Sequence, residues 1–163
     1  MAAETHWRAD AAIAHVVACL GMLYAGALAA GLLTLPSSGQ PIEDPWFTAM
    51  EMLILIIAPA MVALMVVLHA RASPTRRAFG VAAVAFMSIC AGITSGVHFA
   101  ILTLSRAPAF IALPWTERVF SFRWPSVAYA LDILAWDVFF PLAAVCAAAA
   151  VEGSGLLRAA RAL

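Results

Sequence analysis

Four long apolar stretches run through this sequence, and each has the length of a membrane-spanning α-helix. A hydrocarbon core about 30 Å thick is crossed by about 20 helical residues, and the apolar lipid requires each backbone N–H and C=O to bond within the protein. The sequence therefore predicts an all-α membrane protein, a four-helix transmembrane bundle that forms a single domain. The four predicted spans are residues 12–35, 46–70, 78–104 and 127–151.

The composition agrees with this class and excludes several others. Hydrophobic residues make up 65% of the chain, well above the roughly 45–50% that is typical of soluble domains. All nine basic residues are arginine, so a lysine-linked retinal or any other lysine Schiff base is excluded. The arginines form no basic patch, and we expect no nucleic-acid partner. The abundance of alanine and arginine without lysine is typical of a high-GC bacterium, which suggests the bacterial inner membrane.

The placement of the arginines predicts the orientation. Arg71, Arg76 and Arg77 crowd the short loop between the second and third spans, whereas the loop 36–45 carries two acids and no base. Cytoplasmic loops concentrate positive charge, so the arginine-rich loop is predicted to lie inside and both termini to be cytoplasmic. The longer loop 105–126 also carries three arginines and argues in the opposite direction.

The loop 105–126 combines aromatic residues with prolines. Aromatic rings with polar edges favour the headgroup layer, and Pro108, Pro114 and Pro125 prevent one continuous helix. Two interpretations follow: a segment that lies on the outer surface of the membrane, or a lid over a pocket that opens outward.

The chain ends with a Gly-Ser-Gly turn at 153–155, followed by a helix-forming run to Leu163. This run resembles the start of a fifth helix, as expected if further helices of a longer chain follow. A short surface helix is the alternative.

Ionisable residues inside the spans are the features most informative about function. Such residues are rare in lipid and mark ligand sites, proton pathways or contacts between helices. At 1.5 Å per residue, Glu51 lies roughly 7 Å below the outer boundary, His98 roughly 9 Å and Asp132 roughly 7 Å. Three ionisable groups from three helices therefore share one level in the outer half of the bundle.

Asp137 lies deeper, near the midplane, where Thr94 and Ser95 of the third span reach the same layer. One aspartate near the centre of a span costs about 3 kcal/mol, so two acids leave the fourth helix only marginally apolar. We expect Asp132 and Asp137 to face the bundle, to pair or to stay protonated. About 140° of helix rotation separates them, so an acid dyad is not expected. The candidate polar or ion site comprises Glu51, Thr94, Ser95, His98, Asp132 and Asp137.

Two prolines lie close to these acids. Pro59 leaves the carbonyl of Leu55 without its helical donor, and Pro141 does the same for the carbonyl of Asp137. Freed carbonyls beside carboxylates occur at ion sites of transport proteins, but proline is also common in membrane helices that bind no ion.

Two further patterns are weaker. Gly92 and Gly96 of the third span form a small-xxx-small motif, as do small residues of the first span, and such motifs favour close helix packing. His15 and His69 lie near the cytoplasmic ends of their spans, where two imidazoles could ligate a haem iron.

One segment carries a resemblance. Residues 129–140, Tyr-Ala-Leu-Asp-Ile-Leu-Ala-Trp-Asp-Val-Phe-Phe, follow the aromatic loop and resemble a pattern of uncharacterised polytopic bacterial inner-membrane proteins. The resemblance covers the last third of the chain, and it implies longer relatives with helices beyond the position of Leu163. It implies no activity. The position of Asp137 is more often small and neutral in that pattern, so a role for Asp137 would be particular to this chain.

These observations lead to three functional hypotheses. The first is a non-enzymatic integral membrane protein of unknown function, because the sequence contains no zinc spacing, phosphate loop or nucleophile elbow. In this first hypothesis, Glu51, His98 and Asp132 hold the helices together, and no cofactor or metal is bound. The expected partners are the lipid bilayer and either further copies of the chain or further helices of a longer chain. The second hypothesis is a small proton- or cation-coupled transporter or channel subunit. The third is a membrane haem or redox protein.

Overall fold

The computed structural model describes residues 2–37 and 40–151, with side chains of the first helix described from Asp10 onward. The described residues form helices and loops without a strand. Four helical units are long and apolar enough to cross a membrane, which confirms the predicted fold class. They are α1 (Ala2–Leu33), α2 (Trp46–Ala70), α3 (Arg77–Thr103) and a composite fourth unit of α6 (Val127–Ile133), η2 (Leu134–Phe139) and α7 (Phe140–Ala150).

The helix ends follow local sequence signals. Pro45 immediately precedes α2, where the missing N–H of proline costs no helical hydrogen bond. Ser126 caps α6, and its hydroxyl accepts a hydrogen bond from the N–H of Tyr129 at 3.1 Å. The predicted spans agree with the observed helices except that α1 begins ten residues earlier, because its first turns are helix-forming but polar. Three short helices complete the structure: η1 (Pro74–Arg76), α4 (Pro108–Ile111) and α5 (Thr116–Val119).

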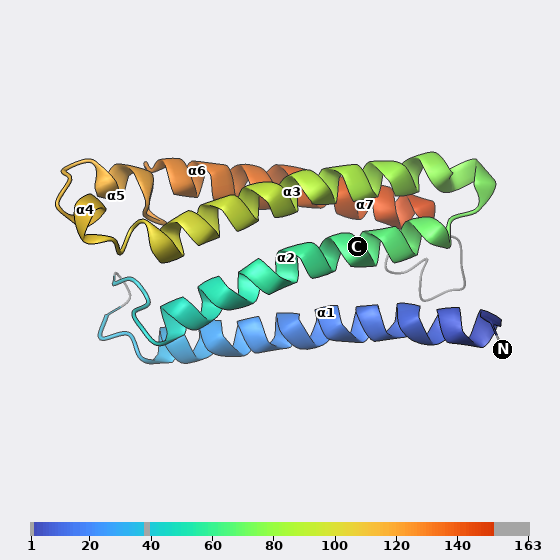
Figure 1. The fold of residues 1–163 in the computed structure, drawn as a ribbon, viewed down its shortest axis with the longest axis horizontal. Coiled ribbons are helices and arrows are strands. Elements are labelled where there is room, and N and C mark those ends of the chain that lie inside the picture. Colours follow the sequence, from blue (N-terminus) through green and yellow to red (C-terminus); the bar gives the residue numbers. More distant parts are fainter. Residues whose placement is uncertain (1, 38–39, 152–163) are drawn as a thin grey trace.

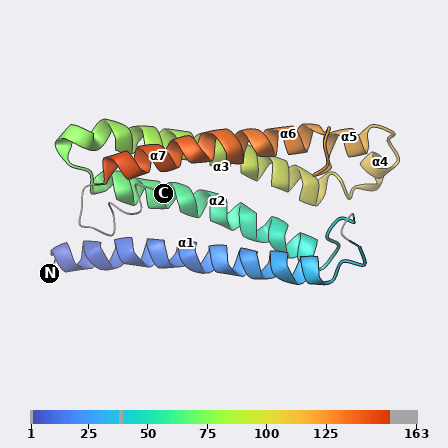
Figure 2. The same ribbon diagram turned by 180° about the vertical axis from the view of Figure 1, so that it is seen from behind.

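The four units lie side by side and alternate in direction along the chain (Figures 1 and 2). α2 packs between α1 and α3, and α3 packs against the fourth unit. The loops before α2 and after α3 therefore meet at one end of the bundle, which we call the aromatic end. The loop between α2 and α3 lies at the opposite end, which we call the arginine end.

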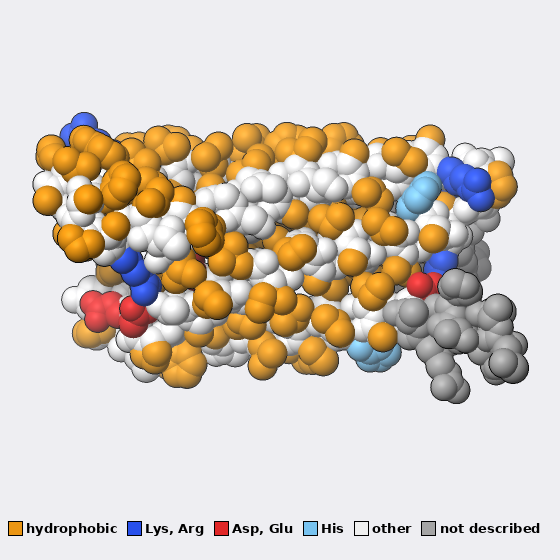
Figure 3. Space-filling view, in the orientation of Figure 1, with side chains coloured by type: hydrophobic (Ala, Val, Ile, Leu, Met, Phe, Trp, Pro, Cys, Tyr) orange, Lys and Arg blue, Asp and Glu red, His pale blue; other side chains and the backbone are white. Residues whose placement is uncertain are grey.

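Charged side chains gather at these two ends, while the visible face between them is largely apolar (Figure 3). At the arginine end, Arg71 forms an ion pair with Asp10 at 2.7 Å, and Arg76 donates to the carbonyl of Ala149 at 2.6 Å. At the aromatic end, Arg106 pairs with Asp44 at 3.2 Å. This distribution is the one expected of a bundle whose central band faces lipid.

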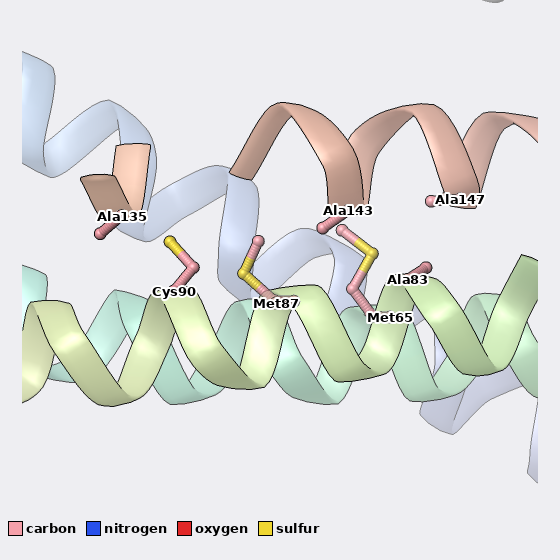
Figure 4. Close-up of a cluster of buried hydrophobic side chains, with 7 residues drawn as sticks. All are labelled: Met65, Ala83, Met87, Cys90, Ala135, Ala143 and Ala147. Carbon is pink, nitrogen blue, oxygen red and sulfur yellow. The ribbon is translucent and has the colours of Figure 1, made fainter. Parts of the chain in front are cut away.

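The main core lies between α2, α3 and the fourth unit. Methionines from α2 and α3 fill the space beside alanines of the fourth unit (Figure 4). The small alanine side chains allow close approach of the backbones, and the flexible methionines fill the gaps that are left. The buried residues are Met65, Ala83, Met87, Cys90, Ala135, Ala143 and Ala147.

The fourth helix contains a π-helical turn, η2, just before Pro141. The N–H of Phe140 donates to the carbonyl of Ala135, five residues back. Proline has no N–H and its ring crowds the carbonyl four residues earlier, so a widened turn relieves the clash. The carbonyl of Asp137, predicted to lose its donor, therefore lies in a turn with altered hydrogen bonding.

The predicted packing role of the small-xxx-small motifs is wrong within the bundle. Gly92 and Gly96 are exposed on α3, and a Cβ built at either position meets nothing within 4 Å. The same is true of Gly21 on α1. Close approach occurs instead at Gly80, where a Cβ would lie 2.6 Å from Nδ1 of His69. Small residues therefore show where approach is possible, but the pattern does not determine which face is packed.

Candidate functional site

His98 lies between two carboxylates from two other helices. Its Nδ1 is 2.9 Å from Oε2 of Glu51 on α2, and its Nε2 is 3.4 Å from Oδ1 of Asp132 on α6. The structure thus brings together the three groups that depth along the helices places at one level. We call Glu51, His98 and Asp132 the acidic triad.

The antiparallel arrangement explains why these residues meet. Glu51 is in the second turn of α2 and Asp132 is in the second turn of α6, while His98 is near the end of α3. All three positions are therefore about one to two turns from the aromatic end. His98 and Glu51 are 6% and 2% exposed, whereas the side chain of Asp132 is 24% exposed. His98 and Glu51 are therefore buried, whereas Asp132 is partly exposed.

The hydrogen-bond geometry constrains the number of protons in the triad. Each of the two N···O contacts requires one bridging proton, because an ionised carboxylate and an unprotonated ring nitrogen are both acceptors. Either both protons belong to the imidazole, or one belongs to the imidazole and one to a carboxyl group. Two protons are therefore the minimum, and with these two alone the net charge of the triad is −1; a third proton on a free carboxyl oxygen makes the triad neutral.

The triad lines a cavity of about 960 Å³ at the aromatic end. Residues 117–118 and 120–125 of the aromatic loop line the same cavity, and the ring of Phe122 lies 5.1 Å from the ring of His98. These contacts support the interpretation of the loop as a lid over a pocket. The prolines divide the loop into two short helices, α4 and α5. The other lining residues include Tyr24, Phe47, Met50, Ile101 and Tyr129.

A second cavity of about 410 Å³ continues from the triad toward the middle of the bundle. It shares Tyr24, His98 and Asp132 with the larger cavity. Its other walls come from α1, α2 and η2, including Met61 and Trp136. The acidic triad therefore lies at the junction between an open cavity and a deeper, more apolar one.

Thr94 and Ser95 do not join the triad. Thr94 is fully buried one helical turn before His98, and its hydroxyl has no hydrogen-bond partner among the described residues. A buried hydroxyl without a partner costs about 1–3 kcal/mol. Ser95 is partly exposed and lines neither cavity.

Asp137 lies elsewhere, which corrects the expectation that it shares the site. Its side chain is exposed on the outside of the bundle, whereas Ala135 of the same turn is fully buried against α3. Asp132 faces His98, so the two aspartates point to different surroundings. The sequence predicts their separation around the helix but not which of the two faces inward.

The two histidines considered for haem have separate neighbours. His69 packs against Gly80 of α3, while His15 is exposed on α1 with its Nδ1 2.6 Å from the carbonyl of Ala11. This arrangement provides no support for a shared iron between them.

Asp44 connects the loop before α2 with the loop after α3 at the aromatic end. The Thr48 hydroxyl, bonded to Asp44, lowers the pKa of that carboxyl, and the N–H of Thr48 and the guanidinium of Arg106 act in the same direction. Asp44 therefore stays ionised at neutral pH. Its ion pair with Arg106 links the start of α2 to the loop after α3.

Sequence reasoning missed the aromatic walls of the site. Both tyrosines of the chain, Tyr24 and Tyr129, line the larger cavity. Tyr24 lies roughly 13 Å from the end of α1, well inside the level where tyrosine usually meets the headgroups. That depth was a usable signal for a polar cavity beside α1.

Comparisons with known proteins give no relative: no family model matches the chain, and neither curated proteins nor solved structures match it.

Proposed function

We propose that this protein is a small transporter or channel subunit of the bacterial inner membrane that binds protons or small cations at the acidic triad. The supporting observation is the position of two carboxyl groups and an imidazole, which can exchange protons, at the junction of two cavities. A charge inside a membrane protein is costly, and it most often marks a substrate, ion or proton pathway.

A purely structural role explains less of the geometry. Contacts between Glu51 and His98 would hold α2 and α3 together without any cavity. Asp132 adds a second carboxylate that is partly exposed to the cavities, where a proton or cation could reach it. The aromatic rings around the cavity favour cations as well, because the faces of aromatic rings attract positive charge.

The proposed path follows from the proposed orientation. If the arginine-rich loop is cytoplasmic, the aromatic end faces outward and the larger cavity is the entrance. A proton or cation would reach Asp132 first, and exchange with His98 and Glu51 would follow over 3.4 Å and 2.9 Å. The deeper cavity beside Trp136 would be the onward route. No enzymatic step is part of this proposal.

Proton flux in proteoliposomes tests the proposal. Vesicles that contain the full chain and an internal pH dye, energised by a potassium diffusion potential, should acidify faster than empty vesicles. Asp132→Asn should slow this flux about tenfold or more, because it removes the carboxylate that exchanges protons with the cavity. Asp137→Asn is the matched control, since that residue lies outside both cavities, and its flux should equal that of the unmodified protein.

Two outcomes would contradict the proposal. Flux no faster than in empty vesicles, measured with protons and then with sodium and potassium, would remove the transport function. Equal flux in the Asp132→Asn variant would remove the triad from the path.

A further inference from the structure

Asp137 is a carboxyl group on the outside of a helix that crosses the membrane. It lies in the π-helical turn η2, roughly 15 Å from the start of α6, which is near the middle of a bilayer. Its side chain is exposed. Even a protonated carboxyl group loses hydrogen bonds in hydrocarbon, so this position requires a partner.

Residues 2–37 and 40–151, which the structure describes, do not provide that partner. Among the described residues, the arginines lie before, after or at the ends of the spans. His98, the imidazole at an intermediate depth, already contacts Glu51 and Asp132. The group that satisfies Asp137 must therefore come from a part of the chain beyond those residues or from another molecule.

Asp137 belongs to a continuous stripe along the fourth helix. Its positions are spaced alternately by three and four residues, as in the seam of a left-handed helix pair; the π-helical turn η2 lies within this run and shifts its phase, so exposure as well as spacing assigns the positions to the outer surface. The positions are Val127, Ala130, Leu134, Asp137, Pro141, Ala144 and Ala148; the first six are exposed and the last is partly exposed. In Figure 2, α6 and α7 lie in front of α3 and no other helix lies in front of them.

We propose that a second copy of this chain packs along this stripe, related by a two-fold axis perpendicular to the membrane. Two copies insert in the same orientation, so each residue of the stripe faces its counterpart at the same depth. Asp137 then faces Asp137, and two carboxylic acids satisfy each other through a pair of O–H···O hydrogen bonds. The small residues Ala130 and Ala144 on either side of Asp137 allow the close approach that membrane helix pairs require.

The polar pair also fixes the alignment of the two copies. A stripe of aliphatic and small residues alone could slide along its partner, whereas one polar position in such a seam specifies the register. This inference is independent of the triad, because Asp132 contacts His98 inside the bundle whereas Asp137, five residues later, is exposed outside it.

Disulfide cross-linking in native membranes tests the contact. In the full chain with Cys19, Cys90 and Cys146 replaced by alanine, Ala144→Cys should form a covalent dimer on mild oxidation. Ile89→Cys is the matched control, because Ile89 is also exposed and at a similar depth but belongs to α3. It should stay monomeric.

The role of Asp137 is tested by energy transfer between labelled copies in liposomes. Asp137→Leu should weaken dimerisation about tenfold, while Asp137→Asn, whose amide can also pair with its counterpart, should weaken it much less. A monomeric unmodified chain, equal dimerisation of the leucine variant, or cross-linking of Ala144→Cys to a different protein would overturn the proposal. Protection of Ala144→Cys in a monomer would also overturn it and would indicate that residues 152–163 or a longer chain cover the stripe.

Discussion

Replacing His98 with glutamine should lower the free energy of unfolding by about 3 kcal/mol where the imidazole carries both bridging protons, because the variant leaves the buried carboxylate of Glu51 without a cationic neighbour. Breaking a buried ion pair by removing one partner costs more than the pair contributes, since the remaining charge is still out of water. Thermal or denaturant unfolding in detergent, compared with the unmodified protein, measures this loss.

The double variant Glu51→Gln with His98→Gln is the control for that interpretation. It removes both buried charges, so most of the stability lost in His98→Gln should return, and the two substitutions should be strongly non-additive. Asp132→Asn should change stability by less than about 1 kcal/mol, because the Asp132 carboxylate is partly exposed and its contact is longer. Simple additivity of the Glu51 and His98 substitutions would contradict the ion pair.

Gly80→Ala should destabilise the protein by about 1–3 kcal/mol through overpacking. Its new Cβ would lie 2.6 Å from Nδ1 and 3.0 Å from Cα of His69, and the second of these atoms is backbone. The helix ends at the arginine end would therefore have to separate. Unfolding in detergent measures the loss of stability. We expect this loss because α2 and α3 can no longer pack closely at Gly80.

Gly92→Ala is the matched control on the same helix. Its Cβ meets nothing within 4 Å, and alanine is favoured over glycine in a helix by about 0.5–1 kcal/mol. This variant should be as stable as the unmodified protein or slightly more stable. If Gly92→Ala lost as much stability as Gly80→Ala, the surface of α3 around Gly92 and Gly96 would be packed rather than exposed.

Much of the fold follows from the sequence because bilayer thickness and backbone hydrogen bonding leave few choices for long apolar stretches. Antiparallel order then converts residue number into depth, which is enough to place Glu51, His98 and Asp132 at one level. Contact among the three depends on helix rotation, which depth does not specify. The structure supplies that rotation through the buried faces of α2 and α3.

Asp137 shows that depth alone does not determine which way a side chain faces. The π-helical turn before Pro141 changes the helix phase at that residue, and the cost of a charge in lipid says that a partner is needed but not where it lies. The aromatic loop was equally ambiguous, since interfacial rings and cavity walls have the same composition. Its residues 120–125 are assigned to the cavity by tertiary packing alone.

Charge-selective labelling within the larger cavity tests the central claim most directly. Glu117, Arg118 and Arg123 line the same cavity as the triad, so the informative quantity is the ratio of the rates at which Phe122→Cys, beside His98 in a chain without its native cysteines, reacts with a cationic and an anionic methanethiosulfonate. Neutralising the triad by Glu51→Gln with Asp132→Asn should lower this rate ratio about tenfold, because focused charge raises the local concentration of cations. Failure of both reagents to react, or a ratio that the two substitutions leave unchanged, would contradict an acidic site that is open to cations.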